Sequence, residues 1–178
     1  PTVVQQTILE ADMTPLERML LSCIFDAERA QHATLFWAIS AAGPESRNLT
    51  ERCILFGGAG PPMLPEPYNS NYQIVQTPDH VVILHEMFRD RRIIPLGERR
   101  HGTIRQWNGD MRGHWEGDTL VIETTNFDAK RRWRNTTESM HLIERLTRVD
   151  AETLLYEFTV TDPAKFVRPW SVRDRKSV

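Results

Sequence analysis

Ionisable side chains interrupt several apolar segments of this chain, and such residues are suited to proton transfer. General acid–base catalysis needs a titratable group whose pKa is shifted by burial or by a neighbouring charge, held inside an apolar pocket. The residues that meet this description are Glu86, His101, His141 and Glu144. We expect them to be the proton donors and acceptors of a catalytic site.

Arginine and tyrosine residues in the same region are suited to hold a substrate. A guanidinium group stabilises negative charge on a substrate oxygen, and a tyrosine hydroxyl can hydrogen-bond a carbonyl. The candidate substrate-binding residues are Tyr68, Arg92, Arg112, Arg145 and Tyr156. A purely structural role is the alternative, because Arg–Glu pairs also tie β-sheets together, and Glu86 with Arg92 would form such a pair.

Other kinds of catalytic site are not indicated. The six histidines show no His-x-His or His-x-x-x-His spacing, so we predict neither a metal site nor a cofactor. No Gly-x-Ser-x-Gly motif marks a serine nucleophile. Cys53 follows Arg52, which favours a thiolate, but a buried small apolar residue is the preferred interpretation of this cysteine.

Composition limits the classes of partner. The net charge of -2 and the pI of about 6.4 argue against a nucleic-acid partner. No apolar run reaches the ~18 residues that a membrane span needs, so no membrane partner is expected. A small-molecule ligand or substrate is the partner that remains.

Short β-type segments between Gln73 and Trp170 must position the candidate residues. Each segment is closed by its own turn signal, as at Thr77-Pro78-Asp79 and Asn108-Gly109-Asp110. Strands at such even spacing predict a mainly β protein, an antiparallel meander that forms a lipocalin-like barrel or half-barrel. Small barrels often hold one small molecule inside.

Residue alternation along the last strands predicts which side chains face the interior. Leu154, Tyr156, Phe158 and Val160 form the apolar face of one strand. The preceding strand is ambiguous, because Glu144 lies on one face and His141 with Arg145 on the other. Either Glu144 or the His141/Arg145 pair therefore faces inward, but not both.

The chain is expected to form one domain over residues 1–178, with a helical segment at 1–43, a Pro/Gly-rich lead-in at 44–72 and the β-barrel at 73–172. Thr14 and Pro15 are suited to begin the helix. Its apolar stripe, which includes Cys23, is expected to cover the sheet. The stripe is equally suited to a homodimer contact.

A series of distinctive motifs lies between residues 45 and 170. They include Arg52-Cys53, Pro67-Tyr68-Asn69, Gln73-Ile74-Val75-Gln76-Thr77-Pro78, Ile104-Arg105-Gln106-Trp107, Trp115-Glu116-Gly117-Asp118-Thr119-Leu120, Glu123-Thr124-Thr125-Asn126-Phe127, Thr153-Leu154-Leu155-Tyr156 and Arg168-Pro169-Trp170. In these motifs the segment resembles a large group of bacterial proteins, many of them exported. The resemblance implies an exported or periplasmic protein, although no signal-peptide pattern follows Pro1. It places His101 and His141 on motif positions and implies no particular reaction.

These observations favour a small cofactor-independent enzyme that acts on a hydrophobic or aromatic small molecule by acid–base chemistry, as a lyase, isomerase or cyclase. The alternative is a non-catalytic, lipocalin-like carrier of an apolar ligand. A carrier predicts an interior of aliphatic and aromatic groups, with Glu and Arg facing solvent. A third hypothesis is a structural domain with a filled core.

Overall fold

The computed structural model describes residues 45, 47, 49–55, 60–65, 70–131 and 133–178. The described residues from Leu49 to Val178 belong to one compact unit. The helix expected to begin at Thr14, together with Cys23 and Tyr68, lies outside the described residues.

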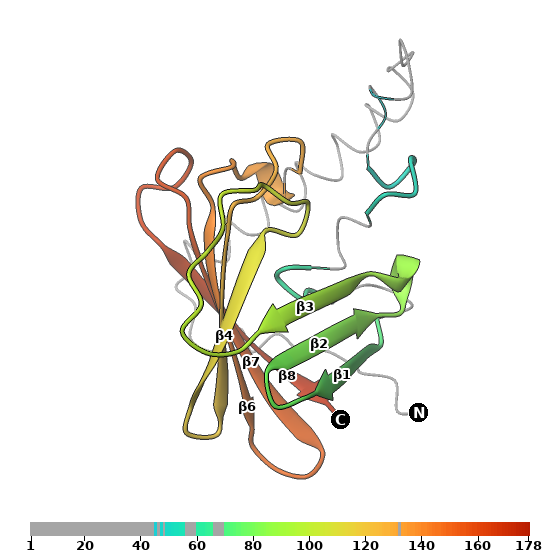
Figure 1. The fold of residues 1–178 in the computed structure, drawn as a ribbon, viewed down its shortest axis with the longest axis vertical. Helices are drawn as coiled ribbons and strands as arrows, with labels where there is room; N and C mark the ends of the chain where they lie inside the picture. The colour runs from blue at the N-terminus through green and yellow to red at the C-terminus, as the bar shows by residue number, and fades with distance from the viewer. Residues whose placement is uncertain (1–44, 46, 48, 56–59, 66–69, 132) are drawn as a thin grey trace, which may run out of the picture. The chain divides into compact units, whose positions relative to one another are not determined.

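The first three strands form an antiparallel sheet in chain order (Figure 1). They are β1 (Tyr72–Gln76), β2 (His80–His85) and β3 (Arg91–Pro95). A tight turn joins β1 to β2, in which the amide of His80 donates a 3.0 Å hydrogen bond to Oγ1 of Thr77. In β2, Val81 and Ile83 are buried and alternate with half-buried neighbours, which is the pattern of a strand with one face on a core.

The remaining strands form a five-stranded antiparallel sheet, also in chain order. These strands are β4 (Asp110–Glu116), β5 (Thr119–Thr125), β6 (His141–Arg148), β7 (Thr153–Thr161) and β8 (Trp170–Ser177). The β4–β5 turn places Gly117 at φ +58°, a conformation that glycine adopts without steric cost. Two short 3-10 segments, η3 (Met87–Arg89) and η4 (Trp133–Asn135), lie in the connections.

The prediction of a mainly β, antiparallel protein is confirmed, but a closed barrel is wrong. In the part of the chain that the structure describes, the strands form two separate sheets, and β1 and β8 each pair with one strand. The long connection at 96–109 separates β3 from β4, so the antiparallel ladder does not continue between them. One isolated bridge, Leu96 to Gly113, links the two sheets there.

One hydrophobic core lies between the sheets, with Val81, Ile83 and Ile94 on one side. From the other side, β7 contributes Tyr156, Phe158 and Val160, as the alternation of the sequence predicted. Trp133 stacks on Trp170 with ring centroids 6.0 Å apart and closes one end of this core. Among the described residues no helix is long and apolar enough to cross a bilayer.

The cross-strand register answers the ambiguity in β6. Glu144 lies opposite Phe158, and Leu146 lies opposite Tyr156. Residues directly opposite in a sheet share a face, so Glu144 faces the core. His141 and Arg145 therefore face the outer side of the five-stranded sheet.

Candidate functional site

The candidate residues Arg92 and Glu144 meet in the core, one from each sheet. Arg92 Nη1 donates a 3.0 Å hydrogen bond to Glu144 Oε1, and Nη2 donates a second, shorter one to Oε2. Glu144 is completely buried and Arg92 nearly so. A bidentate pair with both oxygens engaged is the geometry that compensates the cost of burying two charges.

Tyr156 completes this buried group. Its hydroxyl donates to Glu144 Oε1 at 2.6 Å and accepts a hydrogen bond from the amide of Met63 at 2.9 Å. Burial, followed by the negative charge of Glu144, raises the pKa of Tyr156 well above its ordinary value. The hydroxyl therefore keeps its proton at physiological pH and acts as a fixed donor to the carboxylate.

The charge of Glu144 dominates the state of Arg92. Burial alone lowers the pKa of the guanidinium, but the charge of Glu144 and its hydrogen bonds outweigh this effect and raise the pKa. Arg92 Nε also donates to Sδ of Met111 at 3.4 Å. Every group of this cluster has a partner inside the protein, so the arrangement is that of a structural connection between β3, β6 and β7.

A second buried arginine, Arg131, lies outside the residues that the sequence singled out. Its guanidinium donates to the carbonyl oxygens of Pro61 at 3.2 Å and Gly60 at 2.5 Å, and lies 5.8 Å from the ring centre of Phe127. Burial lowers the pKa of Arg131 to about 10, so the side chain is still cationic at neutral pH. Arg131 thereby fixes the segment that leads to Met63.

The candidate histidines, His101 and His141, meet on the outer face of the five-stranded sheet. Nε2 of His141 lies 2.6 Å from Oε1 of Glu123, and Nε2 of His101 lies 3.5 Å from Oε2 of the same carboxylate. Nδ1 of His101 lies 3.3 Å from Oδ2 of Asp110. Asp110, His101, Glu123 and His141 thus form a chain of alternating acidic and imidazole groups, which we name the histidine–carboxylate cluster.

Three members of the cluster are half-exposed, whereas Asp110 is buried like the Arg92–Glu144 pair. Glu123 has a side-chain exposure of 47%, His141 of 34% and His101 of 22%. The hydrogen bond from His141 lowers the pKa of Glu123, and burial offsets this effect only in part. Glu123 is therefore a charged acceptor for His141, whereas Nε2 of His101 is buried and makes no hydrogen bond within the described residues.

Arg112 lies beside this cluster and orients Asp110. Its Nη1 donates to Asp110 Oδ1 at 2.5 Å, while Nε and Nη2 donate to the carbonyl oxygen of Arg100 at 3.1 and 3.0 Å. The amide of Gly102 donates to Asp110 Oδ2 at 2.7 Å. Arg112 thus binds the loop that carries His101, and its donors are already engaged within the protein.

The other candidates lie apart from both clusters. Glu86 accepts a 2.7 Å hydrogen bond from Asn71, so the predicted pair of Glu86 with Arg92 is wrong. Arg92 forms its ion pair with Glu144 instead, because both side chains point into the space between the sheets. Arg145 pairs with Glu116 at 2.6 Å on the exposed outer face.

Sequence reasoning missed Asp110 and Glu123. A carboxylate that alternates with apolar residues on a strand, as Glu123 does, is expected to face solvent. The outward-facing interpretation is correct, but loop 97–102 folds over this part of the sheet and brings His101 to the carboxylate. The register places Glu123 opposite Ile143, and therefore on the same face as His141, which alternation along each strand alone does not determine.

Across the described ranges, no group of three or more His, Cys, Asp or Glu side chains is arranged to hold a metal ion. Cys53 was expected to be buried, and this is wrong: its thiol is free and exposed.

The interior between the sheets carries charge. Lys176 and Asp174, both buried on β8, form an ion pair at 3.1 Å, in addition to the Arg92–Glu144 pair. The carrier alternative predicts Glu and Arg facing solvent, so this interior differs from the one that it requires.

Comparison of the chain with protein-family models, curated proteins and solved structures finds no match.

Proposed function

We propose that the protein is a small cofactor-independent enzyme that acts on a hydrophobic or aromatic small molecule by acid–base chemistry. His101 and His141 are the proton-transfer groups. Glu123 and Asp110 are positioning residues that orient the imidazoles. The reaction is of the lyase, isomerase or cyclase type, in which a proton is removed from one atom of the substrate and returned to another.

The observation that carries this proposal is the sharing of one carboxylate by two imidazoles, 2.6 and 3.5 Å away. Histidine changes its charge between about pH 5 and 8, so one imidazole can accept a proton while the other donates one. The carboxylate lies within ion-pair distance of both imidazoles. Because the electron pair of the broken C–H bond stays on the substrate and the proton is returned, such a reaction needs no external oxidant or reductant.

The surroundings of the cluster also favour an apolar substrate. Ile143 lies directly opposite Glu123 in the sheet register and is half-buried on the same outer face. A ring or an alkyl group resting on Ile143 would bring a polar atom of the substrate to the imidazoles. Glu144, Arg92 and Tyr156 would serve this enzyme by fixing the sheets, and Arg112 by holding Asp110.

Exchange of carbon-bound hydrogen in D₂O tests the proposal. The protein is incubated with a panel of aromatic and alicyclic ketones and hydroxy acids, and the proton NMR signals next to each carbonyl are followed. We expect exchange in at least one compound, and a decrease of roughly 10²-fold or more in the His141→Asn and His101→Asn variants. His114→Asn is the matched control, because His114 lies on the same face but pairs with Glu116.

Equal exchange rates in the native protein and both histidine variants would overturn the assignment of the cluster. A panel in which no compound exchanges faster than it does in buffer counts against the enzyme itself.

A further inference from the structure

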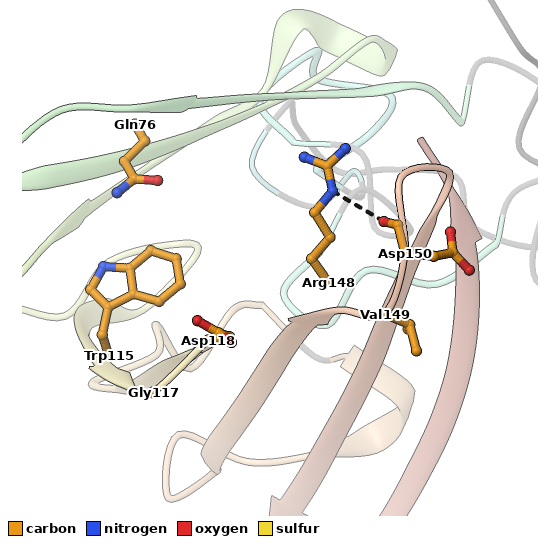
Figure 2. A pocket seen from close by; sticks show the side chains of 7 residues that line it. All are labelled: Gln76, Trp115, Gly117, Asp118, Arg148, Val149 and Asp150. Atoms are coloured by element: carbon orange, nitrogen blue, oxygen red, sulfur yellow. Dashed lines mark hydrogen bonds between the residues drawn. The ribbon is translucent and has the colours of Figure 1, made fainter.

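An open hollow of about 680 Å³ lies at the end of the five-stranded sheet opposite the histidine–carboxylate cluster (Figure 2). Its walls come from the end of β1, the β4–β5 turn and the β6–β7 turn. The lining side chains used below are those of Gln76, Trp115, Asp118, Arg148, Val149 and Asp150. The volume lies within the range of about 300–1,000 Å³ that small-molecule sites occupy.

The apolar part of the hollow is the exposed indole of Trp115, with Val149 on the other side. Trp115 is 44% exposed and Val149 is 55% exposed. The indole makes no ring contact with any other residue that the structure describes. Tryptophan side chains are on average highly buried in folded proteins. A large aromatic face left open to solvent beside polar groups is therefore a feature of ligand sites.

The polar part of the hollow offers both hydrogen-bond acceptors and donors. The carboxylate of Asp118 makes no hydrogen bond or ion pair within the described part of the chain. Arg148 uses Nε and Nη2 to bind the carbonyl oxygens of Asp150 at 3.1 Å and Ala151 at 2.8 Å, which leaves Nη1 for a ligand. The amide of Gln76 supplies one further acceptor and one further donor group.

Asp150 is fixed by its own turn. Its Oδ1 accepts a 2.8 Å hydrogen bond from the amide of Glu152. This bond, with a further one from the side chain of Thr153, lowers the pKa of Asp150. The hollow thus contains two carboxylates and one guanidinium.

This mixture of charges favours a neutral ligand. An organic cation would satisfy Asp118 but would lie against the guanidinium of Arg148. An anion would satisfy Arg148 but would meet both carboxylates. A hydroxyl group is donor and acceptor at once, so neighbouring hydroxyls can donate to Asp118 and accept from Arg148.

We propose that the hollow binds a saccharide, whose apolar ring face rests on Trp115 and whose hydroxyls bond Asp118, Arg148 and Gln76. A sugar ring combines a flat C–H face with a rim of hydroxyls, which matches one open indole surrounded by mixed polar groups. The inference is independent of the proposed function, because no residue of the hollow belongs to the histidine–carboxylate cluster.

NMR titration of ¹⁵N-labelled full-length protein tests the inference. The probes are cellotetraose, maltotetraose and chitotetraose, with arginine amide as a cationic and benzoate as an anionic comparison. We expect at least one saccharide to shift the indole N–H signal of Trp115, identified by its loss in Trp115→Phe, together with the amides of Gly117 and Val149. The two charged probes should leave these signals unchanged.

Two variants separate the parts of the site. Trp115→Ala should weaken saccharide binding roughly tenfold or more, as removal of a central aromatic contact does. Asp118→Asn should weaken saccharide binding as well. Glu98→Gln, which also replaces a carboxylate by an amide but at an exposed site elsewhere, should leave binding unchanged. Trp115 and Asp118 are exposed, so both variants should unfold at the temperature of the native protein.

The inference is overturned if none of the saccharides moves the Trp115 signal. It is also overturned if a charged probe moves that signal and the saccharides do not, or if binding is unchanged in Trp115→Ala.

Discussion

Tyr156 donates a 2.6 Å hydrogen bond to Glu144 Oε1, and both side chains are completely buried on neighbouring strands. Arg92, from the other sheet, binds both oxygens of the same carboxylate. Because the Tyr156 hydroxyl also accepts from the amide of Met63, this one carboxylate connects two sheets and the segment that precedes them. Removal of a side chain from this group should therefore destabilise both sheets.

Removing the cation of this group should strongly destabilise the protein. We expect Arg92→Met to lower the free energy of unfolding by about 3–5 kcal/mol, because it leaves the Glu144 carboxylate buried without its counter-charge. The double variant Arg92→Met/Glu144→Leu should recover most of this loss. The measurement is urea unfolding followed by circular dichroism.

The exposed pair of Arg145 and Glu116 is the matched control for that experiment. Arg145→Met should cost only about 0–1 kcal/mol, since a solvent-exposed ion pair contributes little. Similar losses from Arg92→Met and Arg145→Met would contradict the idea that burial decides the importance of these pairs.

Removal of the Tyr156 hydroxyl should have a smaller effect that depends on Glu144. Tyr156→Phe leaves Glu144 Oε1 and the Met63 amide each short of one partner, which should cost about 1–3 kcal/mol in unfolding free energy. In the Arg92→Met/Glu144→Leu background the cost should be lower, because no carboxylate remains to be satisfied. An equal cost in both backgrounds would show that the hydroxyl acts independently of the carboxylate.

The sequence predicted an antiparallel meander and the inner face of β7, because both depend on local alternation. It did not indicate β8 (Trp170–Ser177), most of which lies beyond the expected barrel at 73–172. It could not choose the inner face of β6, since the choice depends on the exact length of the turn at Asp150-Ala151-Glu152. Once the register places Leu146 opposite Tyr156, Glu144 must face the core.

The sequence could not predict contacts between residues that lie far apart along the chain. Arg92 and Glu144 are 52 positions apart, and nearby Glu86 was the more obvious partner for Arg92. Likewise, Glu123 meets His101 only because loop 97–102 folds over the outer face of the sheet. The sequence indicates His101 and His141 individually, but it does not indicate the carboxylate that lies near both.

The buried histidine His85 should make the fold sensitive to mild acid. Burial lowers the pKa of His85 below its ordinary value of 6.5, and its Nε2 has no hydrogen-bond partner among the described residues. Below pH 6.5 the unfolded chain therefore binds a proton that the folded protein does not. Stability should fall as pH decreases from that value, by up to about 1.4 kcal/mol per pH unit.

The His85→Phe variant tests this dependence. It should flatten the change of the urea midpoint between about pH 7 and 5, because phenylalanine does not titrate. His114→Asn removes an exposed histidine and should leave the slope as in the native protein. If His85→Phe keeps the native slope, the acid sensitivity has another source.

Two glycines with positive φ should respond differently to alanine. Gly109 at φ +72° and Gly117 at φ +58° both pay a backbone cost of about 1–2 kcal/mol for a side chain. A Cβ at Gly109 would also lie 2.6 Å from Cγ2 of Thr124 and 2.7 Å from the carbonyl oxygen of Thr125, whereas nothing lies within 4 Å at Gly117. Gly109→Ala should therefore cost about 1–3 kcal/mol more than Gly117→Ala in thermal or urea unfolding. Equal costs would mean that the contact with β5 relaxes freely.

The contact between His141 and Glu123 should be visible in the titration of the carboxyl group. The hydrogen bond from His141 is the largest cause of the lowered pKa of Glu123, and the contribution of His101 is smaller. His141→Asn should therefore raise the pKa of Glu123 toward its ordinary value of 4.5, and His101→Asn should raise it less. The measurement is the ¹³C shift of the Glu123 carboxyl carbon as a function of pH.

His80→Asn is the control for this titration, because His80 lowers the pKa of Asp79 and lies outside the cluster. It should move the titration of Asp79 and leave that of Glu123 in place. A Glu123 pKa that is insensitive to His141→Asn would remove the electrostatic link between the two groups. The acid–base proposal would then lose the observation that carries it.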